Sequence, residues 1–194
     1  ALAVLTAAGY SVHAAKPADK GPPLCCGRTF ISSGMVDEAR EEANRMITSL
    51  KTFVEKGIPI VGLEPSCLLT LRDEFPSLIP GDATDALSQQ AFLFEEFLAA
   101  EAAKGDLQLK LKAVPAKRAL LHGHCHQKAF AVMSSVQQVL AMVPELAVET
   151  VESSCCGMAG SFGYDAKHYD TSMAMGELSL LPAVREADAD CLIV

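Results

Sequence analysis

The sequence has little positive charge. Its 194 residues contain 16 Lys and Arg against 24 Asp and Glu, which gives a formal net charge of −8. Because phosphate backbones are bound by clustered Lys and Arg, and the basic residues here are scattered, we expect no nucleic-acid partner. Half of the residues are hydrophobic and 21% are charged, which is typical of a folded globular chain and excludes a disordered or collagen-like one.

The sequence also lacks a long apolar run. Its longest uncharged stretches, 1–15 and 129–143, fall short of the ~18 apolar residues of a transmembrane helix, so we expect no transmembrane segment. A basic and apolar secretory leader is missing too, and the cysteine count of seven is odd. Both features favour a reducing compartment over a disulfide framework. We expect a cytoplasmic protein, either free or peripheral to the inner membrane.

Apolar periodicity predicts helices and strands in alternation. Helices are expected over 1–9, 35–56, 82–104, 129–143 and 165–185. Strands are expected over 11–14, 58–63, 118–121, 147–152 and 191–194. Residues 108–115 are expected to form a linker. Such alternation is typical of a parallel sheet with right-handed crossovers.

The order of these features repeats along the chain. Residues 1–107 run helix, strand, Cys-Cys-Gly, helix, strand and Cys; residues 116–194 run strand, Cys, helix, strand, Cys-Cys-Gly, helix and strand. The halves match if the first lacks its opening strand and the second its closing loop, so we expect a truncated piece of a larger polypeptide. The predicted fold class is α/β, with two pseudo-symmetric Rossmann-like repeats, parallel sheets and a site at the carboxyl-terminal strand edges.

Six of the seven cysteines follow a predicted strand or lie in the loop that leads from it into a helix. They are Cys25, Cys26, Cys67, Cys125, Cys155 and Cys156. Such loops lie along one edge of a parallel sheet, where α/β folds bind ligands, so we expect the thiols on one side. Cys191 begins its strand instead, and we expect it to be a buried structural thiol at the opposite edge.

The two adjacent cysteine pairs are the most specific feature. A vicinal disulfide is strained, because consecutive Cα atoms are ~3.8 Å apart and ordinary disulfides need ~4.4 Å or more. Adjacent thiolates instead ligate metal ions, and soft thiolates select zinc, Cu(I) or iron–sulfur centres. Two Cys-Cys-Gly sequences in matching places therefore favour ligation or redox chemistry over chance.

Polar side chains near the thiols form a second set of candidates. They are Arg28, Glu64, His122, His124, His126 and Lys128. Each histidine is expected to support a ligand by hydrogen bonding rather than to bind metal itself, and the two basic residues either offset negative charge or are solvated. The sequence leaves open whether Glu64 is a ligand, a proton carrier or a helix cap. It also leaves open whether the glycine-rich segment 157–163 cradles an anion or is an ordinary turn.

Four motifs together resemble the cysteine-rich domain family with duplicated Cys-Cys-Gly motifs. They are Cys25-Cys-Gly-Arg28, Glu64-Pro-Ser-Cys67, His122-Gly-His-Cys-His-Gln-Lys128 and Ser153-Ser-Cys-Cys-Gly-Met-Ala-Gly-Ser-Phe-Gly-Tyr164. The family includes the cysteine-rich subunit of heterodisulfide reductase, the glycolate oxidase iron–sulfur subunit, lactate-utilisation proteins and the C-terminal region of FAD-linked D-2-hydroxyacid dehydrogenases. The resemblance covers essentially the whole chain, and the last two motifs are most similar to the FAD-linked branch.

The resemblance implies electron transfer through iron–sulfur clusters of the 4Fe-4S type. The family's cluster ligands match Cys25, Cys26 and Cys67 in one repeat and Cys125, Cys155 and Cys156 in the other. Heterodisulfide reductase has Cys-x-x-Cys where this sequence has Glu64-Pro-Ser-Cys67. The opening cysteine of the first repeat and the closing cysteine of the second repeat fall outside the 194 residues. Each site therefore keeps three thiols, and this fragment is expected to carry a cluster, zinc or no metal.

The leading hypothesis is an electron-transfer domain of an FAD-linked 2-hydroxyacid dehydrogenase of the D-lactate, glycolate or D-2-hydroxyglutarate type. The FAD lies on a partner domain or subunit, which carries the substrate chemistry, and electrons pass to a quinone or other acceptor. No residue of this fragment is expected to be catalytic, and the fragment alone is expected to be inactive. The alternatives are a zinc-stabilised interaction module without a redox role and a thiol–disulfide reductase that uses the adjacent pairs directly.

Overall fold

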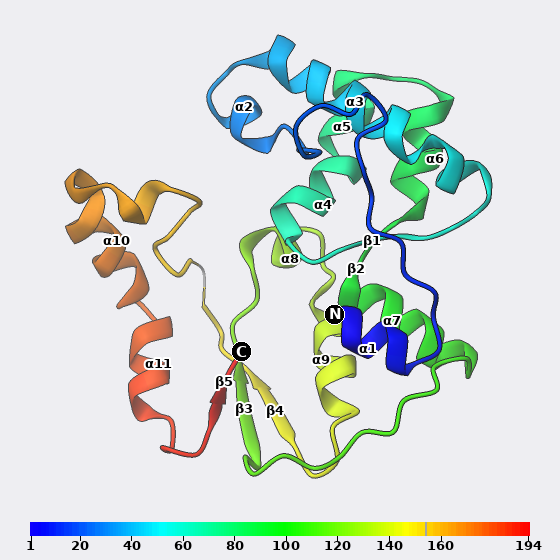
Figure 1. Cartoon of the computed structure of the whole chain (residues 1–194). Helices are drawn as coiled ribbons and strands as arrows, with labels where there is room; N and C mark the ends of the chain where they lie inside the picture. Colours follow the sequence, from blue (N-terminus) through cyan, green and yellow to red (C-terminus); the bar gives the residue numbers. More distant parts are fainter. Residues whose placement is uncertain (154) are drawn as a thin grey trace. The chain divides into compact units, whose positions relative to one another are not determined.

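A computed structural model describes residues 1–153 and 155–194. The chain is mixed α/β with parallel sheets and divides into two compact units, unit 1 (residues 1–109) and unit 2 (residues 110–194) (Figure 1). Residues 108–115, which are predicted as a linker and include the boundary between the units, contain no helix or strand. Ser154, which belongs to one of the predicted motifs, lies outside the described residues.

Unit 1 is mostly helical. Its helices are α1 (Leu2–Ala7), α2 (Arg28–Ser32), α3 (Val36–Glu55), α4 (Pro65–Arg72), α5 (Glu74–Leu78), α6 (Asp82–Gln90) and α7 (Phe94–Lys104). Its two short strands, β1 (Ile60–Gly62) and β2 (Ala91–Leu93), pair in parallel. The largest fully buried side chains of this unit are Phe75, Leu69, Leu87 and Leu93.

The long helix α3 confirms the helix predicted over 35–56. Its buried residues, among them Ala39 and Leu50, recur on one face, as the apolar periodicity requires. Asp37 and Glu38 lie in its first turn, where negative charge is favourable to the helix dipole. Gly57 follows its end with a φ of 68°, a conformation that glycine adopts without steric cost.

The single helix predicted over 82–104 is wrong. Helix α6 ends at Gln90, α7 begins at Phe94, and β2 lies between them. Ala91 and Leu93 are both buried, and β2 pairs with β1. That partner strand lies about thirty residues earlier in the sequence, so local periodicity carries no signal of the pairing, and tertiary context overrides helix propensity here.

The strand predicted over 11–14 is also wrong. These residues are extended chain without strand assignment, and the described residues give them no backbone hydrogen bond to a neighbouring strand. A strand needs a partner to satisfy its N–H and C=O groups. The strand prediction is therefore wrong because the described residues supply no neighbouring strand, although the composition of the segment suits a strand.

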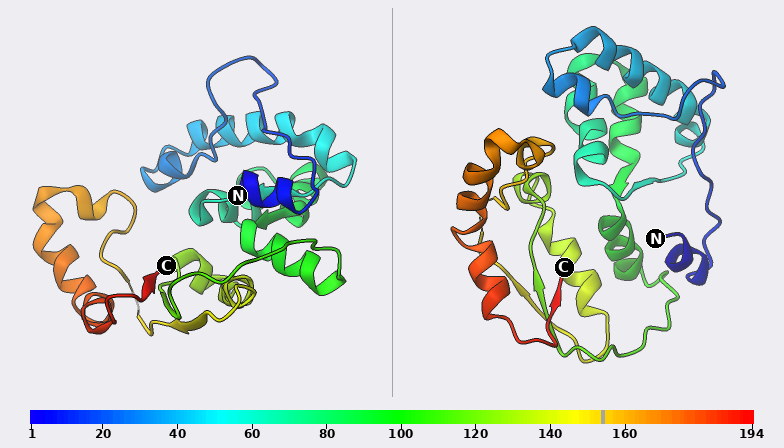
Figure 2. Two further views of the ribbon diagram at one scale, coloured as in Figure 1. Left: turned by 60° about the horizontal axis from the view of Figure 1, so that its bottom comes forward. Right: turned by 60° about the vertical axis from the view of Figure 1, so that its left-hand side comes forward.

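Unit 2 is a three-layer α/β unit. Its parallel sheet has the order β4-β3-β5, with β3 (Arg118–Leu121), β4 (Ala147–Thr150) and β5 (Leu192–Ile193). Its helices are α8 (Cys125–Ala129), α9 (Met133–Ala141), α10 (Tyr169–Gly176) and α11 (Leu180–Glu186), and two short 3₁₀ turns cover Phe162–Tyr164 and Ala166–His168. Figure 2 shows α9 on one side of the sheet and α11 on the other. The strands predicted over 118–121, 147–152 and 191–194 are confirmed, the last two in shorter form.

Two helices predicted in this unit are interrupted. The helix expected over 129–143 begins only at Met133, because Ala131 has a φ of 55° in the left-handed region that ends a helix. The helix expected over 165–185 is split between Gly176 and Leu180. Pro182 accounts for the second break, since proline has no N–H and its ring clashes with the carbonyl four residues earlier.

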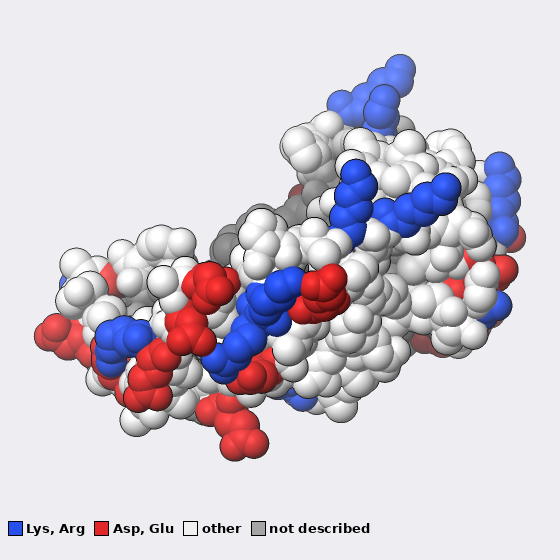
Figure 3. Space-filling model, turned by 90° about the horizontal axis from the view of Figure 1, so that it is seen from below, with Lys and Arg blue, Asp and Glu red and all other residues white. Residues whose placement is uncertain are grey.

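On the face that Figure 3 shows, acidic and basic side chains lie side by side over part of the surface. Arg118 at the start of β3 is an example, because it forms ion pairs with Glu149 at 3.0 Å and Asp188 at 2.8 Å. Such exposed pairs contribute little to stability, and here they engage the Arg118 guanidinium on two sides. Among the described residues, no helix combines the length and the apolar character that crossing a bilayer requires.

Tyr10 anchors the chain after α1 to α7. Its hydroxyl donates a hydrogen bond to Glu101 Oε2 at 2.7 Å, and its ring meets Phe97 edge-on at 5.1 Å between centroids. Burial, this hydrogen bond and the charge of Glu101 raise the pKa of Tyr10 from 10.0 to about 12. The folded state thus prefers the neutral phenol, so the stabilisation is complete below pH 10 and is lost as the pH rises through about 12.

An ultraviolet absorbance titration of the phenols measures this directly. We expect one ionisation near pH 12 in the native chain, which Tyr10→Phe removes and Glu101→Gln moves to lower pH. If all three phenols of the native chain ionise near pH 10, or if Glu101→Gln leaves the highest ionisation unmoved, the hydrogen bond to Glu101 is not as described.

Candidate metal centre

In unit 2 the candidate thiols follow the carboxyl ends of two neighbouring parallel strands. Cys125 is the first residue of α8, directly after β3, and the pair Cys155 and Cys156 follows β4. The thiols of the pair act on that of Cys125 by charge, and Cys155 is also a hydrogen-bonding neighbour. The fold of unit 2 therefore places these three sequence-predicted thiols at the carboxyl-terminal edge of its sheet.

In unit 1 the thiols come from two segments. Cys25 and Cys26 precede α2, and Cys67 lies in the first turn of α4, which follows β1. The thiols of Cys26 and Cys67 are hydrogen-bonding neighbours. Cys26 is buried, whereas Cys25 and Cys67 are exposed. This arrangement is looser than that of unit 2 because only one pair of thiols meets.

The two Cys-Cys-Gly turns share one local geometry. The N–H of Gly27 donates to Cys25 Sγ at 3.4 Å, and the N–H of Gly157 donates to Cys155 Sγ at 3.3 Å. Both glycines have a positive φ, 73° and 90°, and both pack against a following helix, Gly27 against α3 and Gly157 against α10. A backbone N–H thus faces the sulfur of the first cysteine in each pair, and the two turns present that thiol in the same way.

The rest of the glycine-rich segment is an ordinary turn. The N–H of Gly163 donates to the carbonyl of Met158 at 2.9 Å, and Gly160 takes a φ of 66°. The sequence leaves open whether residues 157–163 cradle an anion or form a turn. The N–H of Gly163 is used within the turn.

The thiols of Cys67 and Cys125 are held in the protonated form. Burial raises the pKa of Cys67, and the neighbouring Cys26 and Glu64 raise it further. Burial also raises the pKa of Cys125, and Cys155 and Cys156 add to the effect. In both cases burial is the largest cause, and the neighbouring thiols add to it because closely spaced thiols cannot all ionise. A bound metal ion reverses this balance, since it binds thiolates and releases their protons.

Glu64 is a helix cap. It precedes α4, and its Oε2 accepts a hydrogen bond from the N–H of Cys67 at 2.5 Å. Burial acts to raise the pKa of Glu64, but hydrogen bonds from Cys67 and Ser66 hold it below its usual value. The charged carboxylate thus fixes the backbone that carries Cys67. Arg28, the candidate counter-charge, forms an ion pair with Glu74.

His122 and Lys128 converge on Ser153, a residue to which the sequence pattern assigns no role. His122 Nδ1 and Ser153 Oγ are 2.7 Å apart, and Lys128 Nζ donates to the Ser153 carbonyl at 2.6 Å and its hydroxyl at 3.2 Å. Burial and the charge of Lys128 lower the pKa of His122, which favours the neutral ring, and its Nδ1 shares a hydrogen bond with the Ser153 hydroxyl. The contacts join the segment around Cys125 to the chain just before Cys155.

The other two histidines shape the start of α8. His124 caps the helix, and its Nδ1 accepts from the N–H of His126 at 3.2 Å. Gln127 Oε1 accepts from the N–H of His124 at 3.1 Å, which completes a capping box. The two imidazole rings lie 5.4 Å apart. The structure therefore places both rings beside Cys125, where they orient the helix that begins at this thiol.

The residues present fit a thiolate-bound metal by their chemistry. Each unit supplies three thiols, and backbone N–H groups face the sulfur of Cys25 and of Cys155; such donors suit iron–sulfur centres and zinc. Within the described part of the chain, no three Cys, His, Asp or Glu side chains are already arranged around one ion position.

Removal of the Ser153 hydroxyl is expected to loosen the Cys155 turn. Ser153→Ala deletes the partner of His122 and one contact of Lys128, and such charge-assisted bonds contribute about 1.5–3 kcal/mol. We expect iodoacetamide to alkylate Cys155 about tenfold faster in this variant, because a loss of ~1.4 kcal/mol of protection corresponds to a factor of ten. Mass spectrometry measures the rate of alkylation. Ser153→Thr keeps the hydroxyl and should restore the native rate, while Ser134→Ala, at an exposed position, is a matched control. Equal alkylation rates in all four proteins would rule out this positioning role.

Cys191 departs from its predicted environment. It precedes β5 as expected, but it is half-buried rather than buried, and its thiol contacts the carbonyl of Leu192 at 3.6 Å. Its strand lies at an edge of the sheet, with Leu192 and Ile193 both exposed. An edge strand buries its first residue incompletely, which explains the difference.

Comparison with known proteins identifies relatives of this chain. It is 31% identical over 170 residues to a subunit of the anaerobic glycerol-3-phosphate dehydrogenase of Escherichia coli, covering 87% of this chain and 42% of that protein. It is 30% identical over 157 residues to D-2-hydroxyglutarate dehydrogenase of Pseudomonas putida, covering 79% of this chain and 14% of that protein. Lactate utilization protein A of a Geobacillus species is 28% identical over 183 residues, covering 87% and 69%.

The chain thus spans less than half the length of the first two of these proteins. No solved structure matches it. A family model for the cysteine-rich domain, CCG, matches residues 2–72 and again residues 119–194. These two matches cover more than half of the sequence, and each contains one Cys-Cys-Gly turn. The chain therefore belongs to the cysteine-rich domain (CCG) family.

Proposed function

We propose that this chain is an iron–sulfur electron-transfer domain of an FAD-linked dehydrogenase and passes electrons from the flavin to a quinone or other acceptor. The observation that carries the proposal is the recurrence of one Cys-Cys-Gly turn geometry in both units, with Cys67 and Cys125 each in the first turn of a helix that follows a strand. The proposed ligands are Cys25, Cys26 and Cys67 in unit 1 and Cys125, Cys155 and Cys156 in unit 2. A cluster of the 4Fe-4S type, when bound to such thiolates, supplies one-electron transfer.

The side chains around the thiols have supporting roles. The N–H groups of Gly27 and Gly157 donate hydrogen bonds to the sulfur atoms of Cys25 and Cys155 and fix their position. Glu64 fixes the turn that carries Cys67, and Ser153 fixes the turn that carries Cys155. These groups hold the proposed ligands in place, and none of them acts on an organic substrate. Substrate chemistry belongs to the FAD-binding partner domain or subunit, and the isolated chain is inactive as a dehydrogenase.

The substrate of the partner is a small molecule with an alcohol group. The relatives' names point to glycerol 3-phosphate, D-2-hydroxyglutarate and lactate, and all three carry a hydroxyl on a carbon that can be oxidised. We propose a 2-hydroxyacid of the D-lactate, glycolate or D-2-hydroxyglutarate type, with glycerol 3-phosphate as the other candidate. The proposed location of the assembled protein is the cytoplasm, free or at the inner membrane surface.

The two units are proposed to be two copies of one structural repeat. The copies are assigned to residues 1–107 and 116–194, and the equal geometry of the two Cys-Cys-Gly turns supports this assignment. The order of elements also agrees, since β1 follows α3 in unit 1 as β5 follows α11 in unit 2.

Metal analysis of anaerobically purified protein tests the proposed function. We expect iron together with acid-labile sulfide. Zinc at full occupancy without iron would overturn the proposal and favour a zinc-stabilised interaction module, which thiols and the nearby histidines also suit. Thiol–disulfide exchange activity in the metal-free chain would overturn it in favour of a disulfide reductase.

A further inference from the structure

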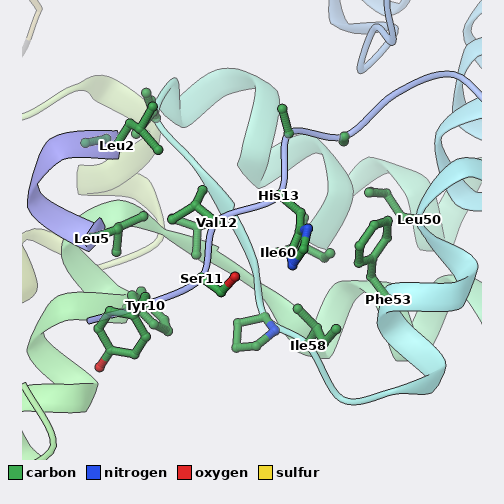
Figure 4. A pocket seen from close by; sticks show the side chains of 17 residues that line it. Leu2, Leu5, Tyr10, Ser11, Val12, His13, Leu50, Phe53, Ile58 and Ile60 are labelled. Atoms are coloured by element: carbon green, nitrogen blue, oxygen red, sulfur yellow. The ribbon is translucent and has the colours of Figure 1, made fainter. Parts of the chain in front are cut away.

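The segment 11–26 leads from Tyr10 to the first thiol pair and has no regular structure. It lies outside every helix and strand, and the described residues give it no main-chain-to-main-chain hydrogen bond. Residues 10–15 line an open, apolar cavity of about 540 Å³, where Figure 4 shows Val12 and His13 beside Ile60. Side-chain contacts therefore decide where the second half of the segment lies, because its own N–H and C=O groups do not fix it.

Arg45 on α3 contacts this second half at two points. Its Nε donates to Asp19 Oδ2 at 2.8 Å, and its Nη2 donates to the carbonyl of Pro22 at 2.7 Å. Its Nη1 donates to Glu42 Oε2 at 2.7 Å, one turn earlier on the same helix, which fixes the plane of the guanidinium. The Arg45 side chain is only 20% exposed. The guanidinium is thus held in one orientation by α3 and holds the segment in turn.

The turn that Arg45 contacts depends on such support. Asp19 Oδ1 accepts a hydrogen bond from the N–H of Gly21 at 2.8 Å, and Lys20 between them has a φ of 56°. A residue with a side chain adopts this left-handed conformation at a cost, and it persists only where surrounding contacts hold it. The contacts of Arg45 with Asp19 on one side and Pro22 on the other meet this requirement.

The turn is joined to the thiol pair by a short and stiff link. Only two residues lie between the Pro22 carbonyl and Cys25, and the first of them is a second proline. Proline fixes its own φ and restricts the residue before it, so little freedom remains along the link. Beyond the pair, Gly27 packs against Ala39, which also belongs to α3. Helix α3 therefore holds the Cys-Cys-Gly turn of unit 1 from both ends.

Unit 2 holds its own pair by a similar contact. There Lys128 donates to the carbonyl of Ser153, two residues ahead of Cys155. In unit 1 Arg45 donates to the carbonyl three residues ahead of Cys25. In each unit a cationic side chain on a helix thus fixes a main-chain carbonyl just ahead of the thiol pair, although the two cations differ in residue type and in helix.

We propose that Arg45 is a positioning residue for the thiols of Cys25 and Cys26. Its guanidinium fixes the segment ahead of the pair and so sets both thiols against α3 before a metal binds. The candidate residues that the sequence pattern indicates do not include Arg45, and it acts on the thiols through Asp19 and Pro22. The consequence for a metal ligand rests on the proposed function, whereas the placement of the pair does not.

Alkylation of the reduced, metal-free chain tests this placement. Arg45→Met keeps an unbranched side chain and removes the guanidinium. Because Cys26 is only 6% exposed, we expect the variant to react with iodoacetamide at Cys26 about tenfold faster than the native chain, measured by mass spectrometry. Arg40→Met is the matched control on the same helix, since Arg40 contacts Asp37 and the carbonyl of Leu78, and its rate should stay native.

Amide hydrogen exchange separates positioning from a general loss of stability. In Arg45→Met we expect faster exchange at Cys26 and Gly27, and native exchange at Leu69 and Leu71, which are buried in α4. A general weakening of unit 1 would accelerate exchange at all four residues equally, and that result would overturn the positioning role.

Two further variants test the route through Asp19. Asp19→Ala should also accelerate alkylation of Cys26, and its combination with Arg45→Met should have no larger effect than Arg45→Met alone, because both remove the same contact. Arg45→Lys keeps the charge but presents a single nitrogen, so it should not restore the native rate. Independent, multiplying effects of the two substitutions, or full rescue by lysine, would overturn the two-point contact.

Binding of Co²⁺ connects the placement to the proposed function. In a chain that carries Cys155→Ser, so that the thiols of unit 1 are the intact set, we expect Arg45→Met to weaken Co²⁺ binding about tenfold, measured by a visible absorbance titration. Unchanged Co²⁺ affinity would overturn the role of Arg45 toward a metal. If the Cys155→Ser chain binds no Co²⁺ at all, the proposed function fails for unit 1, and the alkylation of Cys26 still decides the inference.

Two results of the alkylation experiment would overturn the inference outright. The first is a native rate at Cys26 in Arg45→Met. The second is equal acceleration in Arg40→Met, which would attribute the effect to the loss of any cation from α3.

Discussion

Cys155→Ser is expected to abolish iron retention by unit 2. Cys155 is a proposed ligand, its Sγ accepts the N–H of Gly157, and it adjoins Cys125. Metal ligands must be deprotonated, and a serine hydroxyl stays protonated where a thiol ionises. The affinity for iron should fall by more than the ~10–100-fold that follows when a residue hydrogen-bonded to a metal ligand is removed. Iron and sulfide analysis after anaerobic reconstitution measures it, and Cys26→Ser should have the same effect in unit 1.

The chain offers its own matched control for these substitutions. Cys191 is half-buried, and its thiol contacts the carbonyl of the adjacent Leu192. Cys191→Ser should keep the full iron content. Equal iron loss in Cys191→Ser and Cys155→Ser would indicate general damage by thiol removal, and full iron in Cys155→Ser would remove this residue from the proposed ligands.

Alanine at three glycines is expected to destabilise the fold in a graded series. Gly160 has a φ of 66° and open space around it, so Gly160→Ala costs only the ~1–2 kcal/mol of a left-handed residue. A Cβ on Gly27 would lie 3.2 Å from the Ala39 carbonyl oxygen, which raises the cost to about 2 kcal/mol. On Gly157 it would overlap with the Ser172 carbonyl oxygen, and we expect about 4 kcal/mol or more.

Urea unfolding of the three variants measures the series. The order matters more than each value, because the three substitutions add the same methyl group at a positive φ. If Gly157→Ala is no more destabilising than Gly160→Ala, the close packing of the second Cys-Cys-Gly turn on α10 is not as described. Loss of iron in Gly157→Ala without loss of stability would show that the turn serves the metal rather than the fold.

Sequence patterns predict those parts of the fold whose information is local. The strand over 118–121 is confirmed with the same bounds, and α3 lies within one residue of the predicted helix at each end, because apolar periodicity and helix-end signals reside in the elements themselves. Strand β2 escapes prediction because its existence depends on pairing with β1. The strand over 11–14 fails for the converse reason, since its composition is suitable but no described neighbour pairs with it.

The candidate site also has residues that the sequence pattern identifies and residues whose role only the fold shows. The two Cys-Cys-Gly turns and Cys125 are visible in the sequence because identical residues recur in matching places. Ser153 is a single polar residue without a recurring spacing, and its role emerges only when the fold brings His122 and Lys128 to it. The close contact of Gly157 with Ser172 is equally invisible, because fifteen residues separate them in the chain.

An anaerobic redox titration of the iron-reconstituted chain, followed by visible absorbance and electron paramagnetic resonance, tests the central claim most directly. The account predicts that dithionite reduces the protein with loss of visible absorbance, that a paramagnetic iron–sulfur signal changes in step, and that a quinone reoxidises it. A chain that holds its metal in full but takes up no electrons would contradict the account.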